Sequence, residues 1–305
     1  MLFAAFAVAV LSTPFYSPHL LKYLEKKENK LWEAGIPIKF ADRTRDEITK
    51  MFFSHTLLKP TIPRYYAADL TDDDLYPPAD SPDRLDYRQT HPECFFEPED
   101  QSDCSCCYAF ATLGALSTRR CIAKLDASVV PLSAQHMVSC DHGEAGCQGG
   151  GFNTSWAFLE TEGAVMRDCL PYVSGGTGLS GECPTTCQDG TLLNDTIHYK
   201  AVSASHLKNY NEIMTSLLNE GPVQTGFYVH EDFLYYVGGI YHKTYGSSIG
   251  GHAVLIVGYG SMNNHDYWIV RNSWGSDWGE NGYFRILRGT NECGIENNAW
   301  QVAVK

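Results

Sequence analysis

The sequence predicts an α+β protein whose first half is mainly helical and whose second half is mainly β-structure. Runs with helical spacing end at Gly221-Pro222, and short β-branched and aromatic runs separated by glycines follow. The chain also holds 11 cysteines, none of them before Cys94, which predicts a disulfide-bonded region. Because helices and strands are segregated along the chain, we expect either one α+β domain or two subdomains with a cleft between them.

The composition excludes several classes of function. The 305 residues carry a formal net charge of -13, and no basic cluster is present to neutralise phosphates, so we expect no nucleic-acid partner. After the N-terminus, no apolar run reaches the roughly 20 residues needed to span a bilayer. We therefore expect no membrane anchor after processing. Separately, we expect no metal or other cofactor, and a monomer.

The N-terminus resembles a targeting sequence. Residues 1–16 begin with an apolar run that ends at Leu11 and is followed by Ser12, Thr13 and Pro14, which predicts a signal peptide. The run lacks a basic residue before it, so a membrane anchor or a buried strand is the alternative. A signal peptide and disulfides both predict the secretory pathway, with a lysosome-like acidic vesicle or the extracellular space as destination.

Residues 17–75 differ from the rest of the chain because they contain no cysteine. Helical patterns over 19–30 and 46–53 are separated by a break at 31–35, and a proline-containing acidic stretch follows. This organisation is typical of a removable pro-segment, and an ordinary N-terminal extension is the alternative. Residues 76–305 have the composition of a compact domain. Two glycosylation sequons lie in this domain, at Asn153 and Asn194.

The compact domain should contain four helices followed by four strands. Ser133 is a suitable N-cap for one helix, and glycines at 163 and 221 end two others. The predicted helices cover 107–125, 133–139, 152–162 and 207–219. The predicted strands cover 223–229, 252–259, 267–271 and 283–287. Six histidines have no motif around them and are expected to be surface or core residues: His136, His142, His198, His230, His242 and His265.

Three stretches carry residues suited to nucleophilic catalysis. Cys107 directly precedes an apolar helical run, and the positive end of a helix dipole favours a thiolate. An imidazole such as His252 can keep the thiolate ionised and later protonate a leaving group, and Asn272 can orient the imidazole. Gln101 and the Cys107 backbone N–H could donate to a developing oxyanion.

Two other interpretations of the cysteine cluster at 104–107 are weaker. The interpretation that all three cysteines are disulfide partners or zinc ligands lacks a downstream Cys/His pair with finger spacing. A Cys104-x-x-Cys107 redox pair fits by spacing, but it gives no role to Gln101, His252 or Asn272.

The motifs resemble those of papain-like cysteine proteases, in particular the cathepsin B branch. The family pattern Gln-Gly-x-Cys-Gly-Ser-Cys-Trp-Ala-Phe is similar to the stretch from Gln101 to Phe110. Gly146-Cys-Gln-Gly-Gly150, Asn272-Ser-Trp-Gly275 and Asp277-Trp-Gly279 match further motifs, in family order. Trp32-Glu-Ala-Gly35 is similar to the short cathepsin B pro-segment. The resemblance implies a papain-like α+β fold and a cysteine endopeptidase made as a secreted zymogen, with protein and peptide substrates and its own pro-segment as inhibitor.

The resemblance also implies roles for individual residues. The catalytic residues would be Cys107, His252, Asn272 and Gln101. The substrate-binding residues would be Gly149, Gly150, Gly151, Phe152, Gly226, Ala253, Trp274 and Asn298. The disulfides would join Cys94 to Cys121, Cys104 to Cys147, Cys140 to Cys183 and Cys169 to Cys187. Cys106, Cys107 and Cys293 would then be free thiols.

Two differences from cathepsin B bear on specificity. The stretch 170–183 stands where cathepsin B has a long occluding loop with paired histidines, and it contains no histidine. We therefore expect no dipeptidyl carboxypeptidase activity. Asn298 aligns with a glutamate that accepts arginine in cathepsin B, so a hydrophobic residue should be preferred second before the scissile bond, although Glu296 is close in sequence.

Three departures from the family pattern leave a second functional class open. Ser102 and Ser105 replace glycines, and either would be strained at positive φ. Cys106 places a second thiol beside the proposed nucleophile. The alternative function is therefore that of a catalytically silent homologue that acts as a binding protein.

Overall fold

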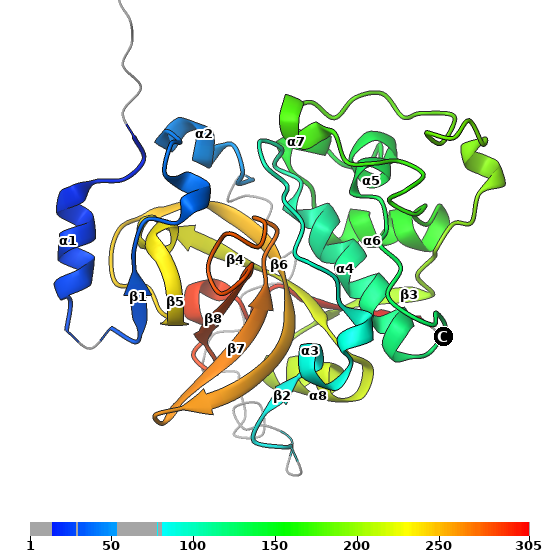
Figure 1. Ribbon diagram of the computed structural model, residues 1–305. Coiled ribbons are helices and arrows are strands. Elements are labelled where there is room, and N and C mark those ends of the chain that lie inside the picture. The colour runs from blue at the N-terminus through cyan, green and yellow to red at the C-terminus, as the bar shows by residue number, and fades with distance from the viewer. Residues whose placement is uncertain (1–13, 29, 54–77, 79–80, 305) are drawn as a thin grey trace, which may run out of the picture.

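The computed structural model describes residues 14–28, 30–53, 78 and 81–304. Figure 1 shows a helical half and a β-rich half side by side, with α1 (Pro18–Lys26) along the outer side of the β-rich half. The term N-terminal segment is used below for residues 14–53 as far as they are described. In the described part of the chain, no helix is both long enough and apolar enough to cross a bilayer.

The helical half is built around α4 (Cys107–Ile122), which lies along the boundary between the halves. The helix packs against β6 (Ser248–Met262). Gly114 permits this close approach, because a Cβ there would lie 3.4 Å from a methyl group of Leu255. Smaller elements surround α4: α3 (Tyr87–Thr90), η5 (Pro92–Cys94), α5 (Ala134–Cys140), η6 (Gly146–Gln148), α6 (Phe152–Thr161), α7 (Ser174–Thr177) and η7 (Leu193–Asp195).

The β-rich half contains a nine-stranded sheet with the order β1-β5-β8-β7-β6-β4-β9-β3, and β2 pairs with β6. Most pairs are antiparallel, and β5 with β8 is parallel. The remaining strands are β1 (Trp32–Ala34), β2 (Leu85–Asp86), β3 (Ser203–Leu207), β4 (Val223–His230), β5 (Tyr236–Tyr241), β7 (His265–Arg271), β8 (Tyr283–Leu287) and β9 (Ala299–Ala303). The helical elements α8 (Tyr210–Glu220), η8 (Glu231–Tyr235) and η9 (Glu292–Gly294) complete this half.

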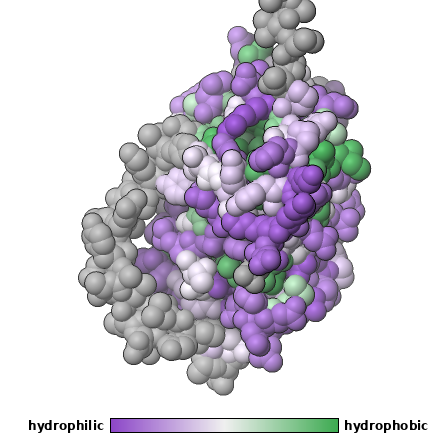
Figure 2. All heavy atoms as spheres, turned by 90° about the vertical axis from the view of Figure 1, so that its left-hand side faces the viewer, coloured by the Kyte–Doolittle hydropathy of each residue, from purple (hydrophilic) through white to green (hydrophobic). Residues whose placement is uncertain are grey.

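The N-terminal segment joins the sheet and covers part of it. It contains α1 (Pro18–Lys26), β1, η1 (Ile38–Phe40) and α2 (Arg45–Thr49). β1 extends the sheet by pairing antiparallel with β5, and the Trp32 indole donates to the His242 carbonyl oxygen at 3.0 Å. Figure 2 shows this face covered mostly by hydrophilic side chains, as expected for a surface in contact with water.

Two buried polar networks hold the halves together. Arg119 of α4 donates to the carbonyl oxygens of Pro222 and Val302, both at 2.8 Å. Gln224 of β4 accepts from the Trp156 indole at 2.6 Å and donates to Thr112 at 2.5 Å. Buried groups left without such partners would cost about 1–3 kcal/mol each, so these networks fix how the halves meet.

Most of the predicted elements are present, but one helix begins later than predicted and several strands were not predicted. Ser133 caps α5 by accepting from the His136 N–H, and Gly163 ends α6 with a φ of +77°. The predicted helix over 207–219 was wrong at its start, because Leu207 pairs with Ala299 in the sheet and α8 begins at Tyr210. Strands β3, β5 and β9 were not predicted, and the expected break at 31–35 is β1. The predicted signal-peptide run to Leu11 and the acidic stretch 71–74 lie outside the described residues.

Four disulfides link the cysteines in the pairs that the resemblance implied. They are Cys94–Cys121, Cys104–Cys147, Cys140–Cys183 and Cys169–Cys187. The three remaining cysteines are free: Cys106 and Cys107 are buried, and Cys293 is partly exposed.

Lowering the pH should destabilise the fold through His136 of α5. Burial lowers the pKa of His136 to about 4, with a contribution from nearby His198, and the ring packs edge-on against Phe158. Between pH 6.5 and 4 the unfolded chain therefore binds a proton that the folded chain does not. This contribution to stability is complete above pH 6.5 and is lost as the pH falls, by up to about 1.4 kcal/mol per pH unit.

Urea unfolding between pH 4 and 7 tests this prediction. The free energy of unfolding of a His136→Gln variant should depend less steeply on pH than that of the wild type. Equal slopes for the two proteins would contradict it.

Candidate active site

Cys107 is the first residue of α4 and lies at the boundary between the two halves. The backbone N–H of Ala253 donates to its Sγ at 3.3 Å, so the β6 strand contacts the thiol directly. Cys106 is the N-cap residue and makes no side-chain capping bond. The Cys107 thiol therefore faces the open N-terminal end of a 16-residue helix, where a negative charge is stabilised.

His252 and Asn272 come from neighbouring strands of the sheet. His252 lies in β6, and Asn272 directly follows β7. The His252 Nε2 lies 2.7 Å from Asn272 Oδ1, and this oxygen also accepts from the Ser273 N–H at 2.8 Å. Nε2 must therefore carry a proton, which leaves Nδ1 as the basic nitrogen. Nδ1 is buried and has no hydrogen-bond partner among the described residues.

Trp274 covers the His252–Asn272 hydrogen bond. The Trp274 indole lies with its centroid 4.9 Å from the His252 ring, inclined by 33°. The indole is fully buried and also contacts Phe40 and Phe52 of the N-terminal segment. Exclusion of water strengthens the hydrogen bond beneath it.

The Gln101 side chain is fixed by three hydrogen bonds. Its Oε1 accepts from the Ser273 hydroxyl at 2.7 Å. Its Nε2 donates to the carbonyl oxygens of Cys104 and Met51, both at 2.9 Å. The Met51 carbonyl thus lies where Gln101 can stabilise an oxygen, next to the start of α4.

The N-terminal segment passes directly over these residues. Phe52 packs edge-on against His252, with ring centroids 5.9 Å apart. Phe53 pairs with Gly251 through two backbone hydrogen bonds of 3.0 and 3.2 Å, and its side chain belongs to the buried cluster that contains Cys107. The segment therefore excludes other molecules from the site.

Burial under this segment keeps both reactive groups neutral. It raises the pKa of the Cys107 thiol to about 12 and lowers the pKa of His252 to about 4. A thiolate–imidazolium pair is therefore disfavoured in the state seen here.

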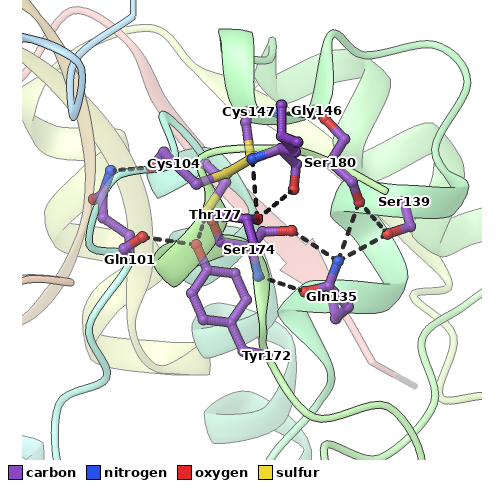
Figure 3. The surroundings of a disulfide bond; sticks show 12 residues. Gln101, Cys104, Gln135, Ser139, Gly146, Cys147, Tyr172, Ser174, Thr177 and Ser180 are labelled. Atoms are coloured by element: carbon purple, nitrogen blue, oxygen red, sulfur yellow. Dashed lines mark hydrogen bonds between the residues drawn. A yellow bond between two sulfur atoms is a disulfide. The ribbon is translucent and has the colours of Figure 1, made fainter. Parts of the chain in front are cut away.

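The neighbouring cysteines 104, 106 and 107 have different environments. Cys104 bonds to Cys147, and Figure 3 shows Tyr172 pointing from the neighbouring loop toward Gln101. The Tyr172 hydroxyl donates to the Gln101 carbonyl oxygen at 2.7 Å and lies 3.1 Å from Cys106 Sγ. Burial raises the pKa of Cys106, so this thiol is a neutral neighbour of the site. A Cys104–Cys107 redox pair is wrong, because Cys104 is bonded elsewhere.

The two serines that replace glycines differ in conformation. Ser102 has a φ of +49°, in the left-handed region that costs a non-glycine residue roughly 1–2 kcal/mol. Its N–H donates to Asp100 Oδ1 at 2.8 Å. Ser105 does not adopt positive φ, so the condition for strain is met at Ser102 alone of the two serines.

The proposed substrate-binding residues lie on both halves. Gly226 and Ala253 are paired across β4 and β6, beside the Cys107 thiol. Gly150 lies over Tyr108, because a Cβ at 150 would come within 2.8 Å of that ring. Phe152 is buried at the start of α6 and belongs to the same cluster as Cys107 and Phe53. Gly149 and Gly151 adjoin Gly150 in the chain.

Two other residues of that set have different surroundings. Asn298 is half-buried next to β9, and its carbonyl oxygen is 3.4 Å from the hydroxyl of Thr225, the residue before Gly226. Trp274 lies over His252. Glu296, adjacent in sequence to the predicted pocket, is buried and accepts from the Trp268 indole at 2.8 Å and the Gly289 N–H at 2.7 Å. The Glu296 carboxylate is thus hydrogen-bonded to other residues of the β-rich half.

Sequence reasoning missed the residues that occupy or support the site. Met51, Phe52 and Phe53 form an apolar triplet, but nothing in the sequence places it against His252. Ser273 follows Asn272 within a recognised motif, and its hydrogen bond to Gln101 could not be anticipated from spacing. The Tyr172 hydroxyl contacts Gln101 across 71 positions of the chain, so spacing in the sequence does not reveal this contact.

Comparisons with known proteins place these observations in context. A family model described as papain family cysteine protease matches residues 81–303. The chain is 42% identical to cathepsin B-like CP2 of Giardia intestinalis, covering 96% of each, and 34% identical to cathepsin B-like cysteine proteinase 4 of Caenorhabditis elegans, covering 91% of this chain and 89% of the relative. Procathepsin B S9 of Trypanosoma congolense has a similar structure, with a TM-score of 0.83 and 27% identity over 96% of this chain and 100% of that one.

Proposed function

Because the chain belongs to the papain family of cysteine proteases, we propose that it is a cysteine endopeptidase in which Cys107 attacks the peptide carbonyl carbon. The observation that carries this proposal is the hydrogen bond between His252 and Asn272 next to the thiol at the start of α4. The fold has the α+β character of the papain family, with a helical and a β-rich half.

The mechanism follows from the positions of four side chains. With the site open to substrate, Nδ1 of His252 takes the thiol proton, and the helix N-terminus stabilises the Cys107 thiolate. The thiolate forms a bond to the carbonyl carbon while Gln101 Nε2 and the Cys107 N–H donate to the oxyanion. His252 then protonates the leaving amine, and the thioester is hydrolysed by a water molecule that His252 deprotonates. Asn272 keeps the imidazole ring oriented.

The N-terminal segment acts as the inhibitor of its own chain in this proposal. Residues 17–75 would be the pro-segment and residues 76–305 the protease domain, after removal of a signal peptide over 1–16. The Met51 carbonyl oxygen accepts from Gln101 in place of a substrate carbonyl, and Phe52 covers His252. These contacts support a zymogen in which the segment must leave before substrate can bind.

The stretch 170–183 supports endopeptidase action without dipeptidyl carboxypeptidase activity. It contains no histidine to bind a terminal carboxylate. It forms the short helix α7, and its ends are held by the Cys140–Cys183 disulfide and by hydrogen bonds of 2.9 and 3.0 Å from the N–H groups of Val173 and Ser174 to Gln135. A substrate could therefore extend past the scissile bond on both sides.

The pocket residues support a preference for a hydrophobic residue second before the scissile bond. Gly226 and Ala253 offer only small apolar groups, and Asn298 carries no charge. The carboxylate of Glu296 is already engaged with Trp268 and Gly289. Phe53, buried in the same cluster as Ala253, has the kind of side chain that we expect the pocket to bind.

The disulfides support a secreted or lysosome-like destination. All four pairs need an oxidising compartment to form. Asn194 is exposed at η7 and Asn153 at the start of α6, so both sequon asparagines are accessible on the folded surface.

Covalent labelling tests the proposed nucleophile. After proteolytic removal of the N-terminal segment, an epoxide-type thiol inhibitor should form one thioether, on Cys107, as located by peptide mass spectrometry. A Cys106→Ser variant should be labelled equally well, whereas the intact chain should react far more slowly because Cys107 is buried. Absence of labelling in the processed protein would favour the silent homologue, and labelling at Cys106 or Cys293 would contradict the assignment of Cys107.

A further inference from the structure

Two carboxylates on either side of Gln101 have no part in the mechanism above. Asp100 precedes Gln101, and Asp103 follows it by two residues. In the structure each is occupied by a cation of the N-terminal segment: Lys39 pairs with Asp100, and Arg43 pairs with Asp103. Even with these partners in place, 43% of the Asp100 side chain and 44% of the Asp103 side chain remain exposed. Both carboxylates would therefore be accessible once the segment has left.

The backbone bridge between Asp100 and Trp274 is the basis for assigning the two carboxylates to the leaving-group side of the site, the side that receives the residues after the scissile bond. Asp100 forms a backbone bridge with Trp274, whose ring covers His252. Because His252 protonates the leaving amine, the substrate chain after the scissile bond must depart along this side. Phe53 pairs with Gly251, the residue before His252, and belongs to the same buried cluster as Ala253.

The N-terminal segment contacts both of these parts of the site. Lys39 and Arg43 lie against the two carboxylates, Met51 reaches Gln101, and Phe53 reaches Gly251. The segment thus runs from the leaving-group side to the other side of the nucleophile. Its cations occupy positions that substrate residues after the scissile bond would take in the processed enzyme.

We propose that Asp100 and Asp103 form a subsite that selects a basic side chain among the first three residues after the scissile bond. The inference rests on the endopeptidase function proposed above. Asp100 Oδ1 is held by the Ser102 N–H, which leaves Oδ2 directed to the Lys39 ammonium group. Burial lowers the pKa of Lys39, and the negative charges of Asp100 and Asp277 oppose this shift. Neighbouring carboxylates with this exposure favour binding of a cation, and the segment shows that lysine and arginine both fit.

Internally quenched peptides provide the test. They share one sequence before the scissile bond and carry lysine, norleucine, glutamine or glutamate in turn at each of the first three positions after it. With the processed enzyme at low ionic strength and near-neutral pH, kcat/KM should be roughly three- to tenfold higher for lysine than for glutamine at one of these positions, the range expected of one or two exposed ion pairs. The ratio should fall toward 1 as salt is added, because salt screens exposed charges.

Matched variants separate the subsite from a general charge effect. The double variant Asp100→Asn/Asp103→Asn should lose the lysine preference, and Asp100→Lys/Asp103→Lys should prefer glutamate. Glu162→Gln, which removes one exposed charge at the C-terminal end of α6, should keep the wild-type ratio. Because each result is a ratio of two substrates for one enzyme, a loss of total activity in a variant does not obscure it.

The possible failures are distinguishable. If every peptide is cleaved without a lysine preference, the two carboxylates serve only to hold the N-terminal segment and the proposed subsite is wrong, while the endopeptidase function stands. A preference that persists in the double Asn variant would also overturn the subsite. If no peptide is cleaved by processed enzyme, the proposed function itself fails.

Discussion

Cys107→Ala is expected to lower kcat/KM for peptide hydrolysis on the order of 10⁴-fold or more. Loss of a nucleophile that works as a unit with its base removes nearly all of the catalysis that the unit provides. The measurement is hydrolysis of an internally quenched peptide by the processed variant. Neither His252 nor Gln101 can form the thioester, so no side chain at the site replaces the missing sulfur.

The adjacent thiol provides a matched control for this variant. Cys106→Ser removes a sulfur one residue away and leaves a hydroxyl that can still contact Tyr172. Its activity should stay close to that of the wild type. An active Cys107→Ala variant together with an inactive Cys106→Ser variant would reverse the assignment of the two thiols.

Gln101→Glu is expected to lower kcat by about 10²–10³-fold, with a smaller effect on KM. The substitution keeps the size of the side chain but replaces the Nε2 donor with an oxygen that repels a developing oxyanion. The expected loss corresponds to about 2.7–4 kcal/mol of transition-state stabilisation, as for removal of one oxyanion donor in other acyl-transfer enzymes. Steady-state kinetics on one peptide would separate kcat from KM.

Ser273→Ala tests the same oxyanion donor with a milder change. It removes the 2.7 Å hydrogen bond that holds Gln101 Oε1 but leaves the Nε2 donor in place. Its kcat should fall less than that of Gln101→Glu. If both variants retained wild-type kcat, Gln101 would have no role in stabilising the oxyanion. The hydrogen bond from Gln101 to the Met51 carbonyl would then not mark the position of a substrate carbonyl.

The sequence allowed good predictions where local chemistry determines structure. Ser133 and Gly163 are recognisable helix ends, and α4 was anticipated from its apolar spacing within three residues of its end. The strand β8 was predicted with its exact bounds because its aromatic and branched residues lie between glycine-rich turns. The relation of Cys107, His252 and Asn272 came from motif resemblance rather than from periodicity.

Features that depend on distant partners were not predictable. β1, β3 and β9 are strands because partners elsewhere in the chain supply their hydrogen bonds, and Leu207 belongs to β3 for that reason. Met51 and Gln101 are 50 positions apart in the chain, so local spacing does not reveal the hydrogen bond between them. The replaced glycines indicated that a serine at positive φ would be strained. Only the structure shows that Ser102 adopts positive φ and that Ser105 does not.

Because of where the disulfides lie, the two halves of the molecule should differ in their sensitivity to reducing conditions. All four pairs fall between residues 94 and 187, and they close loops with sequence separations of 18 to 43 residues. Each such cross-link typically contributes about 2–4 kcal/mol by restricting the unfolded chain. The half that carries Gln101 and Cys107 is therefore dependent on the redox state of its surroundings, whereas the sheet that carries His252 and Asn272 contains no disulfide among its described residues. We expect a reducing compartment to loosen the half that carries Cys107 more than the sheet that carries His252. The proposed activity would therefore need the four disulfides oxidised and the Cys107 thiol reduced.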